Sequence, residues 1–261
     1  MTSTSAPTPI LLVHGGAHGA WCWEPTQALL RAESVAVDLP PRSIRGVTTA
    51  VAPPPETARL GIADFAGAVL DEADASGFDR FVLVGHSMGG LTIAEVARRA
   101  PERVAHLVFV SCIVPPEGGT VVDTLPEAVR DMTRTALDRT RAGDFSLGLG
   151  MSDELKRALF CNDMDEEQAR FVLERCGHEC PTPFTEAVTR TDIPPGLPKT
   201  YVRLARDQAL SPTDQDVQIG SLLASPGGAL TVVDLDTGHD VMVSAPRRLA
   251  EVLDHIAARA A

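Results

Sequence analysis

Residues 81–90 are FVLVGHSMGG, and this stretch decides the fold. Four apolar residues of strand type run into Gly-x-Ser-x-Gly, and residues 91–99 continue with a helical pattern. Ser87 is therefore predicted on a sharp strand-to-helix turn of the kind called a nucleophile elbow. Side chains at Gly85 and Gly89 would collide with the neighbouring strand and helix. Such a turn projects the Ser87 hydroxyl into a cleft, with helix N–H groups behind it.

A second glycine turn follows the first apolar run, Ile10–Val13, which is predicted to be a buried strand. Glycines at this point let the backbone approach a ligand, so the N–H groups of Gly16 and Met88 are predicted to form an oxyanion hole. A phosphate-binding loop is the alternative. It is disfavoured because neither Gly-x-Gly-x-x-Gly nor Gly-Lys-Ser/Thr follows the strand.

Strand and helix patterns alternate along most of the chain, which predicts an α/β fold with a mostly parallel sheet of about six strands flanked by helices. Val47–Glu56, with three consecutive prolines, is expected to be a surface loop. The expected strands are 10–13, 34–38, 81–84, 106–111, 198–205 and 229–235, and the expected helices of the sheet layer are 62–75, 91–99 and 246–256.

Strand signals vanish between residue 115 and about residue 195, where helical patterns appear at 125–140, 153–160 and 165–175, with Ser152 as a helix N-cap. An insertion of this length in an α/β domain is usually a functional lid. We therefore predict a core of residues 1–114 and 196–261, and a helical cap of residues 115–195 inserted before the penultimate strand. The predicted substrate pocket comprises Gly15, His18, Phe145, Leu147 and Phe160, although such aromatic and apolar cap residues often only pack cap helices together.

A serine hydroxyl needs a base, and that base needs an orienting group, before it can act as a nucleophile. Ser87, Asp207 and His239 each follow a predicted strand, in the order Ser…Asp…His that this arrangement requires. His239 is the one histidine placed in a loop after the last strand. Asp234 would point along a strand and Asp236 lies too close to His239 in sequence, so Asp207 is the predicted acid.

Composition excludes some classes of partner. The formal net charge of −12, without a cluster of Lys and Arg, disfavours nucleic acid. No apolar run approaches a membrane span, and Met1–Pro9 lacks the layout of a secretory signal, so a cytoplasmic protein without a membrane partner is expected. A homodimer is an alternative to a monomer, because no pattern in the chain indicates its oligomeric state.

The chain has five cysteines, an odd number that argues against a disulfide framework. Cys161, Cys176, His178 and Cys180 lie near one another in sequence, so a zinc site is an alternative. Because the Cys-x-x-Cys spacing of structural zinc sites is missing, we expect free thiols on helices, no metal and no cofactor.

These motifs together resemble the α/β-hydrolase superfamily, and more narrowly the branch of plant methylesterases, hydroxynitrile lyases and related bacterial esterases. The resemblance covers nearly the whole chain and implies the α/β-hydrolase fold. It rests on residues 14–23 (HGGAHGAWCW), 85–90 (GHSMGG), 158–163 (ALFCND), 206–207 (RD) and 238–242 (GHDVM).

Two departures from the related lyases bear on the reaction. The lyases carry a threonine where this chain has Gly15, and a lysine that stabilises departing cyanide where it has Asp240. A carboxylate would oppose that anion, so hydrolysis is favoured. Epoxide hydrolases and dehalogenases of the superfamily use an aspartate nucleophile, which Ser87 disfavours.

The expected function is therefore that of a serine hydrolase acting on a carboxylic ester, lactone or thioester of a small, largely apolar molecule through an acyl-enzyme on Ser87. A lyase or decarboxylase that uses the same cleft without acylation is the alternative within enzymes. A small-molecule receptor on this fold is a further alternative, and tight binding without turnover would distinguish it.

Overall fold

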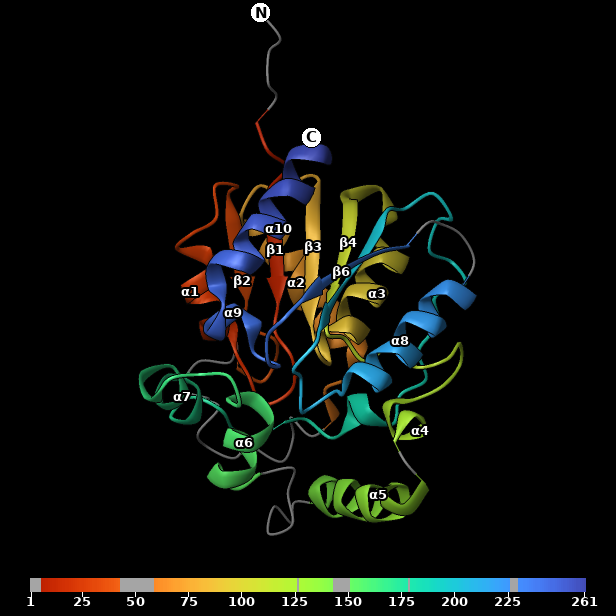
Figure 1. Cartoon of the computed structure of the whole chain (residues 1–261). Helices are drawn as coiled ribbons and strands as arrows, with labels where there is room; N and C mark the ends of the chain where they lie inside the picture. The colour runs from red at the N-terminus through yellow and green to blue at the C-terminus, as the bar shows by residue number, and fades with distance from the viewer. Residues whose placement is uncertain (1–5, 43–58, 126, 143–150, 178, 226–229) are drawn as a thin grey trace, which may run out of the picture.

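A computed structural model of the chain describes residues 6–42, 59–125, 127–142, 151–177, 179–225 and 230–261. Its centre is a six-stranded sheet in which every pair of neighbours is parallel, in the order β2-β1-β3-β4-β5-β6 (Figure 1). This confirms the predicted α/β-hydrolase architecture. The strands are β1 (Ile10–Val13), β2 (Ser34–Val37), β3 (Phe81–His86), β4 (Val104–Val110), β5 (Lys199–Leu204) and β6 (Leu230–Leu235).

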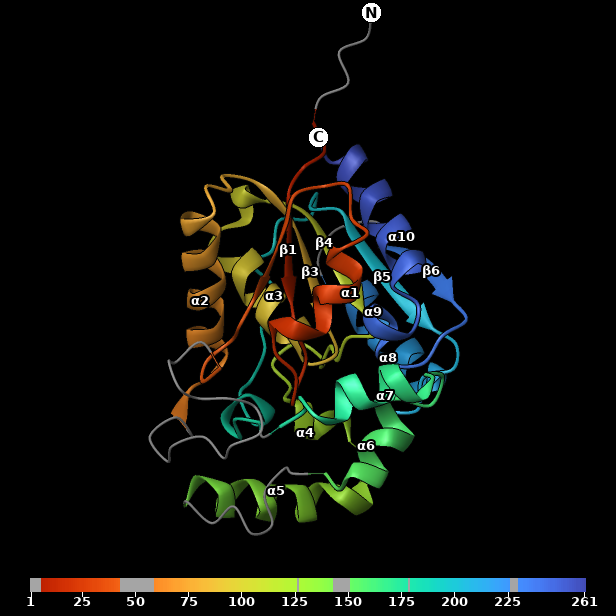
Figure 2. The same cartoon turned by 90° about the vertical axis from the view of Figure 1, so that its left-hand side faces the viewer.

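Alternate residues of the central strands face two separate cores, as the period of two in a strand requires. Leu11 and Val13 of β1 pack in a cluster with α2 and α3, whereas Ile10 and Leu12 pack in a second cluster with α9 and α10. Figure 2 shows α2 and α10 on opposite sides of the sheet. The sheet-layer helices are α1 (Glu24–Gln27), α2 (Ile62–Ala75), α3 (Gly89–Arg99), α8 (Pro212–Ala224), α9 (Val241–Ser244) and α10 (Pro246–Arg259).

A helical insert connects β4 to the penultimate strand β5, as predicted. Figures 1 and 2 place it beyond the end of the sheet at which the strands finish. Ser152 accepts a hydrogen bond from the Leu155 N–H, which confirms it as an N-cap. The insert contains α4 (Val121–Thr124), α5 (Glu127–Arg141), α6 (Asp153–Phe160) and α7 (Glu166–Leu173).

One helix was not predicted, and one expectation about the elements needs correction. Helix α8 has weak amphipathic character because it buries glutamines, Gln215 and Gln218, in place of an apolar stripe, although Ser211 as N-cap and Pro212 after it are start signals of a helix. The cysteines are free, as expected, but Cys161, Cys176 and Cys180 lie after helices rather than on them.

Some predictions fall on residues outside the described ranges. These are the loop at 47–56, the pocket residues Phe145 and Leu147, and His178. No described helix combines the length and the apolar character needed to cross a bilayer.

Candidate active site

The turn that carries Ser87 has the strained geometry that the sequence predicts. Ser87 lies between β3 and α3 with φ of 51°, in the left-handed region that non-glycine residues rarely adopt. A Cβ atom on Gly85 would lie 2.9 Å from the Gly89 carbonyl oxygen, and one on Gly89 would lie 2.8 Å from the His14 carbonyl oxygen. Only glycine fits at either position, because both close contacts are with backbone atoms.

The glycine turn after β1 packs directly on the Ser87 turn. A Cβ atom on Gly15 would lie 2.7 Å from Cβ of Ser87, and one on Gly16 would lie 3.0 Å from Sδ of Met88. No described residue accepts a hydrogen bond from the N–H of Gly16 or Met88. Both predicted oxyanion donors are therefore adjacent and free of partners within the described chain.

The next N–H of the same turn is occupied. Ala17, with φ of 62°, donates its N–H to Oε2 of Glu179 over 2.8 Å, and Arg42 contacts the same oxygen at 3.0 Å. Glu179 and Arg42 are both buried, and Glu179 also accepts the Cys180 N–H over 2.8 Å. The insert thus supplies a carboxylate that fixes the backbone immediately after Gly16.

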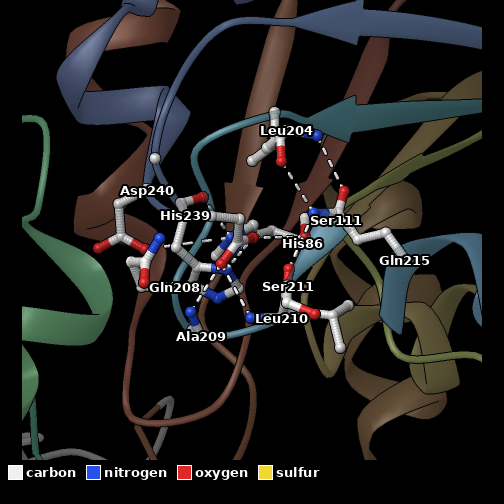
Figure 3. A network of polar contacts seen from close by, with 12 residues as sticks. His86, Ser111, Leu204, Gln208, Ala209, Leu210, Ser211, Gln215, His239 and Asp240 are labelled. Carbon is white, nitrogen blue, oxygen red and sulfur yellow. Dashed lines mark hydrogen bonds and ion pairs between the residues drawn. The ribbon is translucent and has the colours of Figure 1, made fainter. Parts of the chain in front are cut away.

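Asp207 and His239, 32 residues apart in sequence, meet in the structure. Nδ1 of His239 lies 2.7 Å from Oδ2 of Asp207, and the Ser111 hydroxyl donates to the same oxygen over 2.6 Å (Figure 3). The other carboxylate oxygen accepts the N–H groups of Ala209 and Leu210, both over 2.8 Å. Four donors therefore surround the carboxylate, an arrangement that stabilises its ionised form.

The pKa values of this pair shift in opposite directions. Burial opposes the charge of Asp207, but His239 and the hydrogen bonds outweigh it and lower the pKa of Asp207. Burial likewise lowers the pKa of His239, but the Asp207 carboxylate outweighs that effect and the net pKa is raised above 6.5. Asp207 is thus an anion that orients His239 and stabilises the protonated imidazole.

The unpredicted helix α8 holds the loop that carries Asp207. Gln215, fully buried, accepts the Leu204 N–H over 2.8 Å and donates to the carbonyl oxygens of Leu204 and Leu210, at 3.0 and 2.8 Å. Figure 3 shows Gln215 reaching to the end of β5 at Leu204. These three hydrogen bonds bracket residues 204–210 and so fix the placement of Asp207.

A second buried acid–base pair lies beside the first. Nε2 of His18 lies 2.9 Å from Oδ2 of Asp240, the residue after His239, and both side chains are at most 1% exposed. Burial opposes charge on both groups, but their mutual attraction dominates, raising the pKa of His18 well above 6.5 and lowering that of Asp240. His18 also contacts the Gly16 carbonyl oxygen through Nδ1 at 2.7 Å. The His18–Asp240 pair therefore connects the glycine turn after β1 to the His239 loop.

His86 lies between the two pairs as a neutral ring. Burial first, and then the charge of His239, lowers the pKa of His86 to about 3. Its Nε2 lies 3.1 Å from the His239 carbonyl oxygen, a contact in which the neutral ring donates. His86 therefore supports the backbone of His239 without adding a charge.

Aromatic rings cover one side of His239. The Phe160 ring stacks on His239 with centroids 5.6 Å apart and meets His18 edge-on at 5.2 Å. Of the predicted pocket residues, Gly15, His18 and Phe160 therefore lie around Ser87 and His239. His18 is 1% exposed, and its two ring nitrogens contact the Gly16 carbonyl oxygen and the Asp240 carboxylate. It therefore supports the wall of the site.

Within the described residues, one cluster could hold a metal by distance alone, with ligand atoms of His86, His239 and Asp240 within 4.8 Å of one another. Each of these residues already has a partner inside the protein. His239 bonds Asp207, Asp240 pairs with His18, and His86 bonds the His239 carbonyl.

Comparison with known proteins agrees with the fold. Residues 10–252 match the model of the alpha/beta hydrolase family. The chain belongs to this family. The match spans most of the chain and confirms the resemblance drawn from the sequence.

The chain is similar to esterases of this family over nearly its whole length. The chain is 28% identical over 273 residues to esterase PIR7B of Oryza sativa subsp. japonica, covering 98% of this chain and 97% of the relative. It is 27% identical to the carbendazim hydrolyzing esterase of Nocardioides sp. strain SG-4G, over 93% and 97% of the two chains. An extracellular alpha/beta-hydrolase from a Paenibacillus species superposes with a TM-score of 0.78 at 21% identity, over 96% and 99% of the chains, which shows the shared fold.

Several residues of the site escaped the sequence reasoning. Ser111, Gln215 and Glu179 carry no motif and are recognised only from their hydrogen bonds to Asp207, its loop and the oxyanion turn. The sequence drew attention to Asp240 for its charge and to His18 as a pocket residue, but not to the ion pair between them. The stretch 158–163 did carry a signal, since it resembles the relatives named from the sequence.

Proposed function

We propose that this protein is a serine esterase that cleaves carboxylic esters of small, largely apolar molecules through an acyl-enzyme on Ser87. The observation that carries the proposal is the 2.7 Å contact between Nδ1 of His239 and Oδ2 of Asp207, at the strand ends where Ser87 occupies its strained turn. The esterase relatives from rice and Nocardioides support the same reaction class. Lactones and thioesters are close variants, because their acyl carbons undergo the same attack.

The proposed reaction begins with proton transfer from Oγ of Ser87 to Nε2 of His239, since Nδ1 is held by Asp207. Ser87 attacks the acyl carbon to form a tetrahedral intermediate. His239 then returns the proton to the leaving alcohol oxygen, and the acyl-enzyme remains. Water gives a proton to His239 and attacks the acyl carbon, and His239 then returns that proton to Oγ of Ser87 as the bond to the acyl carbon breaks and the carboxylic acid is released.

The oxyanion of both tetrahedral intermediates would be stabilised by the N–H groups of Gly16 and Met88. Their adjacency to Ser87 and their freedom from described partners support this role. Ala17 is excluded because Glu179 occupies its N–H. Loss of one such donor typically costs about a hundredfold or more in turnover.

The surroundings of His239 favour an apolar substrate and disfavour the lyase alternative. Phe160 covers the His239 ring, with ring centroids 5.6 Å apart. Asp240, buried and with its pKa lowered, places a carboxylate where the related lyases have a lysine for an anionic leaving group. Hydrolysis of a neutral ester needs no such cation.

The decisive experiment is the intact mass of the native protein and of Ser87→Ala after incubation with a fluorophosphonate probe. We expect a single adduct on the native protein and none on the variant, and at least a ~10⁴-fold loss of turnover of p-nitrophenyl esters in Ser87→Ala. Absence of an adduct and of ester turnover in the folded native protein would refute the acyl-enzyme. A panel of esters, lactones and thioesters of increasing acyl length then defines the substrate.

A further inference from the structure

Two residues of the helical insert contact both loops of the proposed acid–base pair. Asn162 and Asp163 form the turn between α6 and α7, which the Met164 N–H closes by donating to the Cys161 carbonyl oxygen over 3.1 Å. Neither residue touches a reacting atom. Their contacts are with the residues immediately before Asp207 and His239.

Asp163 holds the His239 loop. Its Oδ2 accepts the N–H of Gly238 over 2.6 Å and the Ser244 hydroxyl over 3.1 Å, and its side chain is 3% exposed. Gly238 directly precedes His239, and Ser244 ends α9. The carboxylate therefore spans the segment that carries the imidazole.

Asn162 holds the Asp207 loop in the same way. Its Nδ2 donates to the carbonyl oxygen of Arg206 over 2.8 Å, and Arg206 directly precedes Asp207. Arg206 also joins the two loops, since its N–H donates to the Thr237 carbonyl oxygen over 2.9 Å and its guanidinium lies 3.7 Å from Oδ2 of Asp163.

The turn at Asn162 and Asp163 packs closely against the His239 loop. A Cβ atom on Gly238 would lie 2.5 Å from Oδ1 of both Asn162 and Asp163. A second contact from the insert reinforces the docking, because Gln168 of α7 donates to the Val243 carbonyl oxygen over 2.9 Å. Because Gly238 has no side chain, the insert can approach the backbone next to His239 closely.

We propose that Asn162 and Asp163 are positioning residues, which set the distance and angle between Asp207 and His239 from the helical insert. The inference rests on the proposed function of the Ser87 site. Small displacements of a general base cost large factors in rate, so a contact one residue away from the imidazole affects turnover without binding substrate. The docked insert is then part of the catalytic geometry as well as a cover.

The test compares Asp163→Ala with Asp163→Asn and with Asp165→Ala. Asp163→Asn keeps an oxygen acceptor for the Gly238 N–H. Asp165 follows this turn and caps α7, accepting the N–H groups of Glu167 and Gln168, so its loss perturbs the insert but removes no hydrogen bond of Asn162 or Asp163 to the two loops. For p-nitrophenyl ester turnover we expect kcat to fall about tenfold to a hundredfold in Asp163→Ala, with KM nearly unchanged.

We expect Asp163→Asn to recover most of kcat, and Asp165→Ala to stay within about threefold of the native protein despite a lower Tm. Asn162→Ala should act in the same direction as Asp163→Ala and give less than the product of the two losses in the double variant, because both serve one geometry. Native kcat in Asp163→Ala, or an equal loss in Asp165→Ala, overturns the proposal.

A readout independent of turnover separates this inference from the proposed function. In Ser87→Ala protein, the low-field proton NMR resonance of the His239–Asp207 hydrogen bond is followed with and without Asp163→Ala. Loss or a large shift of the resonance in Asp163→Ala, but not in Asp165→Ala, supports positioning even if the native protein proves inactive toward esters. The positioning proposal is overturned if Asp163→Ala leaves the resonance unchanged and if the Asp163→Ala protein that keeps Ser87 reacts with the fluorophosphonate probe as the native protein does. The esterase proposal would remain intact.

Discussion

The two halves of the candidate site are built in different ways. The Ser87 half is local, because a strand, two glycines and a helix within residues 81–99 create the strained turn. The Asp207–His239 half consists of two loops 32 residues apart, held by Ser111, which follows β4, by Gln215 from α8 and by Asp163 from the insert. The position of the proposed nucleophile is therefore set by backbone sterics, whereas the positions of the proposed acid and base are set by long-range hydrogen bonds.

The largest effect is expected from breaking the long-range half at Asp207. Asp207→Asn should lower kcat/KM by about 10⁴-fold, because an amide neither stabilises the imidazolium nor enforces the tautomer with the proton on Nδ1. The elbow would remain intact, so circular dichroism and Tm should change far less than activity.

The pH profile of the same pair sharpens this prediction. His239 acts as a base only when neutral, and its pKa is raised above 6.5 by Asp207 against the effect of burial. Activity of the native enzyme should therefore fall as pH drops through a midpoint above 6.5. In Asp207→Asn the residual activity should have a lower midpoint, and an unmoved midpoint would show that Asp207 does not control the base.

The neighbouring pair should matter for stability more than for chemistry. Asp240→Asn leaves His18 buried without its counter-ion, and removing one member of a buried ion pair costs about 3–5 kcal/mol of unfolding free energy. Urea denaturation of the two proteins measures this difference.

The pH dependence of that difference has a definite sign. The folded pKa of His18 is raised, so its contribution is complete below its ordinary value of 6.5 and is lost as pH rises through the folded value. The folded pKa of Asp240 is lowered, so its contribution is present above 3.8 and is lost as pH falls through the folded value. The loss of unfolding free energy in Asp240→Asn should thus be greatest between pH 3.8 and pH 6.5 and should become smaller in alkaline solution. A loss that does not change with pH would argue against a charged pair.

A smaller effect is expected from breaking the local half at its glycines. In Gly89→Ala the new Cβ meets the backbone oxygens of His14 and Val13 at 2.8 and 2.9 Å, so overpacking should cost about 1–3 kcal/mol and lower turnover as the elbow shifts. Gly67→Ala on α2 is the matched control, because no atom lies within 4 Å of its Cβ position and alanine favours a helix by about 1 kcal/mol. Equal Tm values for the two variants would refute the steric account of the elbow.

Prediction from sequence succeeded where the signal is local or periodic. The helices at 62–75 and 153–160 have the predicted bounds, and the six strands lie close to the predicted ranges. It failed for α8, which buries glutamine side chains against loop backbone and so lacks an apolar stripe.

The sequence by itself determined the fold and the strained Ser87 turn and was sufficient to predict that Asp207 and His239 meet, because the steric requirements of a turn and the order of strand ends appear as local patterns. Only the tertiary structure decided how the Asp207–His239 pair is held: by Ser111, Gln215, the His18–Asp240 pair and the turn at Asn162–Asp163. These partners are polar residues without spacing rules. Their role comes from hydrogen bonds that span up to 222 residues of sequence, and no local pattern records which distant groups a side chain will meet.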